Sequence, residues 1–264
     1  MNYEVLSYAD LAFAALLLLI NGAVSVAFEL GMARSLLIAS VRMVVQLLLI
    51  GVILDFLLST VSPLWTGLAV LTMLGFAGYE AMARQDRRLK GFWGYGLGAG
   101  AMCFAALLMM GFALTTQVAA DPWYHPRYLL PLLGMVLGNC MTGVALAIRA
   151  ITAALSDGRA AVEAQLVLGR SFRRAVLPMT RAALRTALTP TINAMAATGL
   201  VSLPGMMTGQ ILAGIDPVEA VKYQLLVMFL ISGATGIGVT IAVFSVLRRL
   251  TDTRHRLRLD RLSE

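Results

Sequence analysis

Charged residues, cysteines and histidines are all scarce in this chain of 264 residues, and each scarcity excludes a class of protein. Asp, Glu, Lys and Arg together make up 13% of the sequence, against about 25% in soluble globular proteins. So few charged side chains cannot cover a water-exposed surface, and a disordered chain would need more charge and less hydrophobicity. Two cysteines are too few for a secreted disulfide scaffold. Two histidines leave little room for acid–base chemistry, so we do not expect an enzyme.

Apolar residues dominate what is present. They make up 59% of the chain, and the mean hydropathy is +0.82. A membrane-spanning helix needs about 20 mostly apolar residues, and the first apolar run follows a leader without Lys or Arg, which predicts a retained span and not a signal peptide. The sequence predicts seven spans, at 8–28, 36–58, 63–83, 92–117, 129–151, 190–213 and 222–247. We therefore predict an all-α, multi-pass membrane protein, with one transmembrane domain over residues 1–264.

The basic residues predict the orientation of the spans. With the N-terminus outside, 18 of the 21 Lys and Arg residues fall in inner segments, and only Arg127 and Lys222 fall outside. Positively charged loops stay on the cytoplasmic side, so this asymmetry predicts an N-out, C-in chain. The same distribution argues against nucleic acid as a partner despite the net charge of +7, since a binding groove needs its arginines on one surface. Anionic membrane lipid is the expected contact of the inner loops.

One inner segment, 156–189, is too charged to span the membrane. Ser156 and Asp157 are favourable N-cap residues, and Pro178 is expected to end an amphipathic helix. Four charged side chains fall on one face of that helix at 100° per residue: Arg159, Glu163, Arg170 and Arg174. Two interpretations are open. The helix either lies on lipid headgroups or docks a cytoplasmic partner.

This segment also resembles a known motif. Glu163–Ala164–Gln165, with Gly169 and then Leu177–Pro178, is similar to the EAA loop of ABC-transporter permeases, whose coupling helix inserts into the ATPase subunit. Three stretches resemble the FetB/YbbM family of ABC-exporter permeases, and together with the spans they extend the resemblance over nearly the whole chain: 42–51, 132–143 and 202–224.

The resemblance implies a permease subunit in the cell inner membrane that exports iron in metal homeostasis. It implies two permease copies and a cytoplasmic ABC ATPase that binds ATP and Mg. This chain contains no G-x-x-x-x-G-K-[ST] phosphate loop, so we expect no cofactor on it. The residues implied to couple to the ATPase are Glu163, Ala164, Gly169, Arg170, Phe172 and Arg174. The alternatives are an ATP-independent channel or carrier and, as cargo, another metal or a nucleotide sugar.

Polar residues and helix breakers within spans are candidates for the translocation path, because each is costly in hydrocarbon. Arg42 either snorkels to the headgroups or meets a buried partner. Pro204 and nearby glycines interrupt the sixth span, which leaves 204–223 as part of a kinked helix or as an outer re-entrant loop. The path candidates are Arg42, Gln46, Asn139, Asn193, Pro204, Met206, Met207 and Gln210. The sequence leaves open whether the path holds a metal site, and the candidate ligands for one are Met206, Met207, Gln210 and Cys140.

Overall fold

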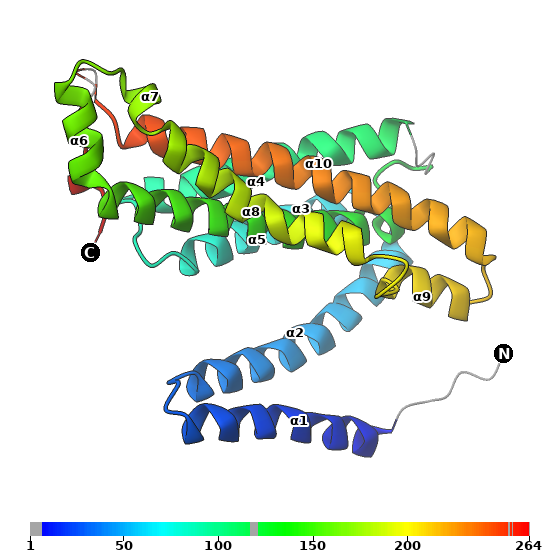
Figure 1. The fold of residues 1–264 in the computed structure, drawn as a ribbon. Helices are drawn as coiled ribbons and strands as arrows, with labels where there is room; N and C mark the ends of the chain where they lie inside the picture. The colour runs from blue at the N-terminus through cyan, green and yellow to red at the C-terminus, as the bar shows by residue number, and fades with distance from the viewer. Residues whose placement is uncertain (1–6, 117–120, 253, 255, 264) are drawn as a thin grey trace. The chain divides into compact units, whose positions relative to one another are not determined.

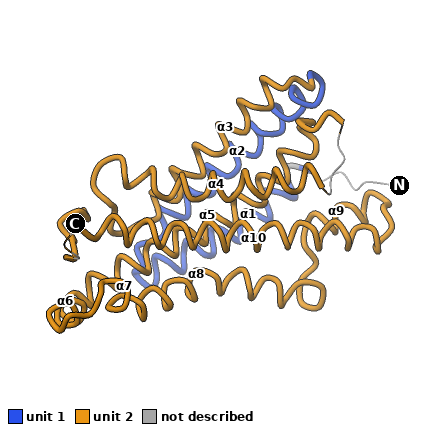
Figure 2. The backbone as a smooth tube through the Cα atoms, turned by 90° about the horizontal axis from the view of Figure 1, so that it is seen from above, with its two compact units in different colours: residues 1–60 blue, residues 61–264 orange. Residues whose placement is uncertain are grey.

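The computed structural model describes residues 7–116, 121–252, 254 and 256–263. These residues form ten α-helices and one short 3-10 helix, and none of them lies in a β-strand, which confirms the all-α prediction. Contacts divide the chain into two compact units, 1–60 and 61–264, shown in separate colours in Figure 2. The single domain over 1–264 stays a prediction.

The first unit is a hairpin of α1 (Tyr8–Ala27) and α2 (Ala33–Thr60). Ser7 starts α1 through a capping box, in which the Ser7 hydroxyl accepts from the Asp10 amide (3.2 Å) and the Asp10 carboxylate accepts from the Ser7 amide (2.9 Å). In the turn, Gly31 adopts a φ of +66°. Both helices are apolar and almost entirely exposed, as expected for helices that meet lipid or other membrane helices.

Five long helices form the bundle of the second unit (Figure 1). They are α3 (Pro63–Ala83), α4 (Trp93–Thr116), α5 (Pro126–Asp157), α8 (Leu177–Ala197) and α10 (Pro217–Arg249). Short elements follow at the two ends: α6 (Arg159–Val167), α7 (Phe172–Ala175), α9 (Gly205–Leu212) and η1 (Leu259–Arg261). We call the end with α6, α7, η1 and the 84–92 loop the α6 end, and the end with α9 and residues 121–125 the α9 end.

The centre of the bundle is packed without spare space. A Cβ on Gly143 of α5 would lie 2.7 Å from Thr235 Cγ2 of α10 and 3.6 Å from the Ala187 carbonyl oxygen of α8. A Cβ on Gly238 would lie 2.6 Å from Cys140 Sγ. Small residues therefore let α5, α8 and α10 approach one another closely. The same contact places Ala187, Gly143 and Thr235 at one level of the bundle.

Among the described residues, six helices are long and apolar enough to cross a membrane: α1, α2, α3, α4, α5 and α10. The predicted sixth span, 190–213, is wrong. That range holds the end of α8, the turn at 198–204 and the separate helix α9, so a single kinked span there is wrong as well. The error arose because α8 carries Arg181 and Arg185 in its first half, and a search for apolar runs starts too late.

The continuous amphipathic helix predicted from Ser156 to Pro178 is also wrong. Ser156 and Asp157 form the last turn of α5, so they are not N-cap residues of a new helix. Gly169 has a φ of +79°, a left-handed conformation that ends α6 and turns the chain. Pro178 lies in the first turn of α8, where a missing N–H costs nothing. The segment between α5 and α8 is therefore two short helices, and residues 177–189 belong to a bundle helix.

Candidate functional site

The segment from Gly158 to Val176 projects an apolar tip from the α6 end. Val162 and Phe172 are buried in the core and anchor the segment. The C-terminal end of α6 carries Val167 and Leu168, whose side chains are 87% and 81% exposed. Arg159 Nε donates to Glu163 Oε1 (2.7 Å) along α6. The result is a fixed helix that presents two large apolar side chains away from the bundle.

The residues predicted to couple to an ATPase are divided by this arrangement. Ala164, Gly169, Arg170 and Arg174 are exposed, and Glu163 is half-buried beside Arg159. Phe172 is 5% exposed, so it holds the segment in place and does not form part of the surface. The break at Gly169 separates Arg170 and Arg174 from the face that carries Arg159. Sequence reasoning missed Val167 and Leu168, although two apolar residues directly before a helix-ending glycine were a usable signal.

A groove of about 740 Å³ separates α6 from the C-terminal tail. It is lined by Arg159, Glu163, Leu166, Val167, Arg256, Leu257, Arg258 and Asp260. The Arg258 side chain donates to both Asp260 carboxylate oxygens at 2.8 Å and holds the pKa of Asp260 at about 2. Hydrogen bonds from the Arg256 backbone and side chain lower the pKa of Asp252. The groove is thus a charged surface with its ion pairs formed at neutral pH, next to the apolar tip.

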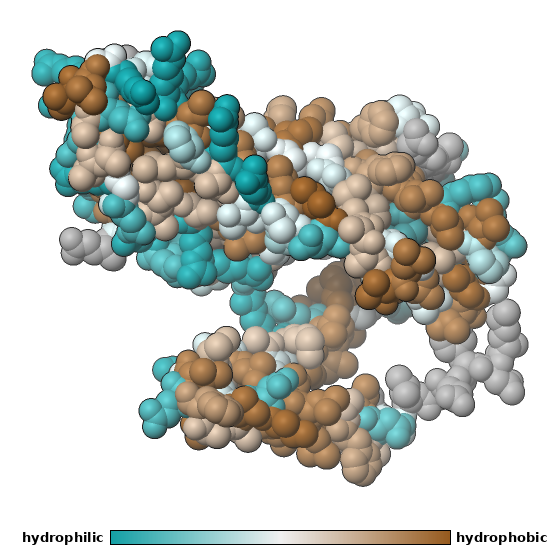
Figure 3. Space-filling model, in the orientation of Figure 1, coloured by the Kyte–Doolittle hydropathy of each residue, from teal (hydrophilic) through white to brown (hydrophobic). Residues whose placement is uncertain are grey.

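The C-terminal tail closes the α6 end by pairing with the 84–92 loop. The Lys90 amide donates to the Arg261 carbonyl (2.8 Å), and the Ser263 amide donates to the Arg88 carbonyl (2.7 Å). Figure 3 shows hydrophilic residues gathered at this end, over α6 and α7. The basic loops assigned to one side by sequence therefore do meet at one end of the second unit.

The predicted path residues fall in three separate places. Arg42 and Gln46 lie exposed on α2, in the first unit. Asn139 on α5 and Asn193 on α8 are both exposed side chains of the bundle, and Asn139 Nδ2 donates to its own helix at the Met135 carbonyl (2.9 Å). The remaining four residues, Pro204, Met206, Met207 and Gln210, begin or form α9.

The α9 group offers mixed evidence for a path. Met206 packs against the core cluster of the α9 end, as a space-filling side chain does. Gln210 Oε1 is buried and accepts no hydrogen bond from the described residues, and the same holds for Gln224 Oε1 on α10. Buried amide oxygens are normally paired. Gln210 stays a path candidate, and Gln224 joins it from the structure.

Cys140 has a structural role in the bundle. Its side chain is fully buried, and its thiol donates to the Ala234 carbonyl at 3.5 Å across the α5–α10 contact. Among the described residues, no group of three or more His, Cys, Asp or Glu side chains could hold a metal ion. The methionine candidates stay untested predictions.

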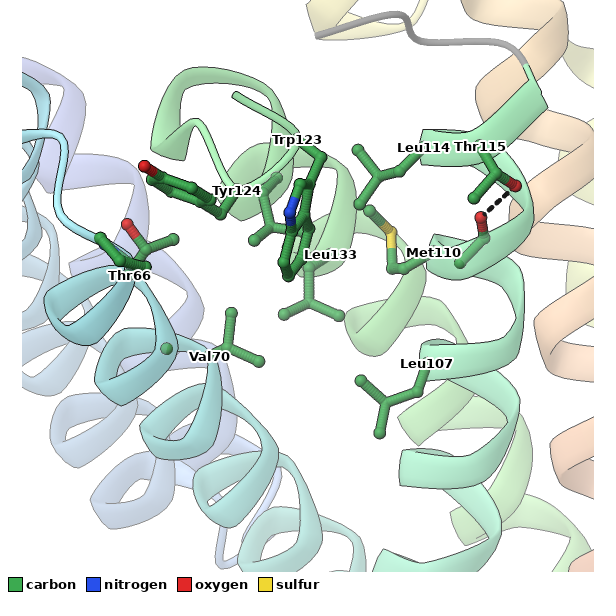
Figure 4. Close-up of a pocket in the computed structure, with 13 residues that line it drawn as sticks. Thr66, Val70, Leu107, Met110, Leu114, Thr115, Trp123, Tyr124 and Leu133 are labelled. Atoms are coloured by element: carbon green, nitrogen blue, oxygen red, sulfur yellow. Dashed lines mark hydrogen bonds between the residues drawn. The ribbon is translucent and has the colours of Figure 1, made fainter. Parts of the chain in front are cut away.

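A pocket of about 450 Å³ lies at the α9 end between α3, α4 and α5 (Figure 4). Its walls are mainly apolar, with Leu133 and Leu107 below the ring of Trp123 and Met110 beside it in the view of Figure 4. Thr66 and Thr115 line it too, but their hydroxyls donate to carbonyls of their own helices. A pocket whose walls are mainly apolar suits hydrocarbon more than an ion.

Two aromatic residues that precede α5, Trp123 and Tyr124, line this pocket. Trp123 and Tyr124 meet edge to face, with centroids 5.7 Å apart. His125 caps α5, because its Nδ1 accepts from the Arg127 amide at 3.3 Å. This histidine therefore has a local structural role.

Comparisons with known proteins identify similar chains. The sequence model described as "Uncharacterised protein family (UPF0014)" matches residues 8–251. The UPF0014 membrane protein slr1647 of Synechocystis is 38% identical over 86% of this chain and 86% of its own length. The probable iron export permease protein FetB of Escherichia coli is 29% identical over 100% of both chains. The protein ALUMINUM SENSITIVE 3 of Arabidopsis thaliana is 34% identical over 73% of this chain and 68% of its own. No solved structure matches.

Proposed function

The chain belongs to the UPF0014 family of membrane proteins, and from that premise we propose that it is the permease subunit of an ABC exporter of iron. Iron is the cargo printed in the name of the FetB relative, which aligns over the full length of both chains. In this proposal two copies of the chain cross the inner membrane with their N-termini outside. A separate ATPase binds ATP and Mg on the cytoplasmic side and drives transport.

The exposed tip of α6 is the observation that carries the proposal. Val167 and Leu168 project from a helix that is anchored on both sides by buried residues, Val162 and Phe172. Apolar side chains on a fixed helix fit a groove of a partner protein. The charged groove beside the tip gives that partner polar contacts at the rim, as in other protein interfaces.

Transport would follow from movement of this tip. Closure of the ATPase on ATP would push α6, and α6 is linked through Gly158 to α5 and through α7 to α8. The chain itself performs no ATP chemistry in this mechanism, since it lacks the phosphate-binding motif. The permease would alternate between states that open toward one side and then the other, and the ATPase would supply the free-energy difference.

The rival is an ATP-independent channel or carrier in which α6 rests on lipid headgroups. That interpretation uses the same feature, because apolar side chains beside arginines also insert into a membrane surface. The two proposals differ in what happens when the tip is made acidic. A docking tip loses its protein partner, whereas a headgroup-bound tip leaves transport intact.

The experiment uses two matched double variants. Val167→Asp with Leu168→Asp changes the tip, and Leu200→Asp with Val201→Asp changes an equally exposed apolar pair at the α9 end (95% and 84%). We expect co-purification with the ATPase to fall about tenfold or more for the tip variant, the loss expected when interface anchors are replaced by charges. The control pair should bind the ATPase normally. Equal binding by both variants would contradict docking at α6.

Transport into inverted membrane vesicles tests the cargo. Vesicles containing the chain and the ATPase receive ATP with iron, with other divalent ions or with nucleotide sugars. We expect ATP-dependent iron uptake that the tip variant abolishes. Uptake that needs no ATP would support the channel or carrier, and uptake of a nucleotide sugar alone would replace iron as cargo.

A further inference from the structure

Helix α8 has an exposed face that does not suit lipid. Four polar residues recur every four positions along it, and all four are exposed: Arg181, Arg185, Thr189 and Asn193. The opposite face, with Thr180, Ala183 and Ala187, is buried against the bundle. We call the four exposed residues the α8 polar stripe. A polar stripe opposite a packed face is typical of a helix whose outer side meets water or protein.

The contact at Gly143 sets the depth of this stripe. The Ala187 carbonyl lies beside Gly143, and both lie level with Thr235 in the middle of α10. Asn193 is six residues further toward the α9 end, about 9 Å at 1.5 Å per residue. Asn139 on α5 is four residues from Gly143 in the same direction, about 6 Å. The exposed side-chain amides of Asn193 and Asn139 therefore lie at nearly the same depth in the bundle. This depth is well inside the length of α5, which has 32 residues.

Lipid is a poor neighbour for such groups. An amide without a hydrogen-bond partner is costly in hydrocarbon, and the described part of the chain offers the Asn193 side chain none. The apolar exposed faces of α10 and α4, with Phe229 and Phe104, already suit lipid. The stripe thus requires protein, water or both against it.

We propose that the α8 polar stripe is the face at which two copies of this chain meet, and that the two stripes enclose the water-filled transport path. This inference rests on the proposed function for the assembly of two copies, and it adds which face of the chain forms the contact between them. A twofold axis along the membrane normal brings each residue of the stripe opposite the same residue at the same depth. Asn193 can donate and accept, so two copies satisfy each other. The Thr189 hydroxyl donates to the Arg185 carbonyl (2.7 Å), and its oxygen still accepts.

The arginines fit the same arrangement. Arg181 and Arg185 lie toward the α6 end, where their long side chains extend to water. Opposed arginines repel unless water separates them, so the α6 end of the interface is its wide, hydrated part. The Asn193 side chains of the two copies then form the narrow part of the interface, near the depth of Asn139.

Cysteine cross-linking tests the proposal. Thr189→Cys and Asn193→Cys are made separately in a Cys103→Ser background, with the buried Cys140 kept. Phe229→Cys is the control, because Phe229 is 63% exposed and lies six residues from Thr235 in the direction of the α9 end, at the depth of Asn193. Membranes without ATP or ATPase are oxidised with copper phenanthroline. We expect about tenfold more disulfide-linked dimer for the two stripe variants than for the control, as an isologous contact demands.

A second reagent reports on water. A membrane-impermeant, charged methanethiosulfonate should label Asn193→Cys and leave Phe229→Cys unlabelled. Equal dimer formation at Phe229, or none at both stripe positions, would overturn the proposal. If the chain stays monomeric and the stripe cysteines are not labelled by the charged reagent, α1 or α2 covers the stripe. If a cross-linked product heavier than the dimer appears, another protein covers it. Either result would overturn the proposal. Since no ATPase is present, a failed docking experiment leaves this result intact, and a failed cross-link leaves the ATPase proposal intact.

Discussion

The two ends of the second unit are held together by different kinds of bonds. At the α6 end the bonds join residues far apart in the sequence: Arg149 Nε with Asp86 (2.7 Å), Arg87 with Asp157 (3.3 Å), and the Lys90 amide with the Arg261 carbonyl (2.8 Å). Loop, helix and C-terminal tail thereby form one connected platform beneath α6.

At the α9 end the bonds are local. The Gly199 amide donates to the Ser202 carbonyl (2.9 Å), Asp216 caps the amides of Val218 and Glu219, and Lys222 pairs with Glu219 (2.6 Å). Each bond closes a turn within a few residues. The difference shows that the α6 end is cross-linked between distant segments, while α9 can open locally with few bonds to break.

The largest difference between the ends should come from the buried anchor of the segment from Gly158 to Val176. Phe172→Ala removes a core side chain that is 5% exposed, and such changes cost about 3–5 kcal/mol of unfolding free energy. Leu203→Ala at the α9 end, where the side chain is 58% exposed, should cost about 0.5 kcal/mol or less. Denaturant titration in detergent micelles measures both. Similar losses of unfolding free energy at the two positions would contradict the difference between the two ends.

Removal of the C-terminal tail should loosen only the α6 end. A chain that ends at Asp252 loses the carbonyl that accepts from the Lys90 amide. Hydrogen exchange at Lys90 should accelerate by about 10- to 100-fold, because exchange follows the local opening free energy. The Val218 amide at the α9 end is the internal control and should exchange at its original rate. Unchanged protection at Lys90 would show that the tail adds no stability.

Loss of the α10 cap tests the opposite end. Asp216→Ala frees the amides of Val218 and Glu219 and should cost about 1 kcal/mol, the usual value of an N-cap. Exchange should accelerate at these two amides and not at Lys90. A response that spread to Lys90 would contradict the local character of the α9 end.

The smallest effect is expected from the ion pair between Arg149 and Asp86. Both side chains are more than half exposed (58% and 64%), and exposed pairs contribute about 0.2–1 kcal/mol. A double-mutant cycle with Arg149→Gln and Asp86→Asn should give a coupling in that range, and the coupling should disappear at about 1 M salt, where the Debye length is about 3 Å. A coupling that survives high salt would assign this pair a larger structural role than the backbone bonds beside it.

Composition and apolar runs were sufficient to predict most of the fold. The ranges 36–58, 63–83 and 222–247 lie inside α2, α3 and α10 because apolar side chains dominate those helices all round. Prediction from apolar runs was wrong at α8, because the α8 polar stripe lowers the hydropathy of this helix. A helix covered by protein and water does not need to be apolar. The exposed polar residues of α8 are therefore the reason why a search for apolar runs does not find this helix.

The segment from Gly158 to Val176 shows a second limit of prediction from sequence. Helical periodicity identified charged residues on a face, but it could not show that Gly169 adopts a positive φ or that Pro178 starts a helix. These depend on where α8 packs, which is a tertiary fact. The tail pairing between residues 88–90 and 261–263 joins segments about 170 residues apart and leaves no local pattern to detect.

The close approach at Gly143 has a mechanical consequence. With no room for even a methyl group between α5 and Thr235, these helices cannot slide or tilt past one another without a clash, and α8 lies in contact at the same point. In the proposed mechanism a displacement of α6 would therefore move α5, α8 and α10 together as one rigid body, and the opening of a path would take place at the outer surfaces of these helices. Gly143→Val would force α5 away from α10 at this contact.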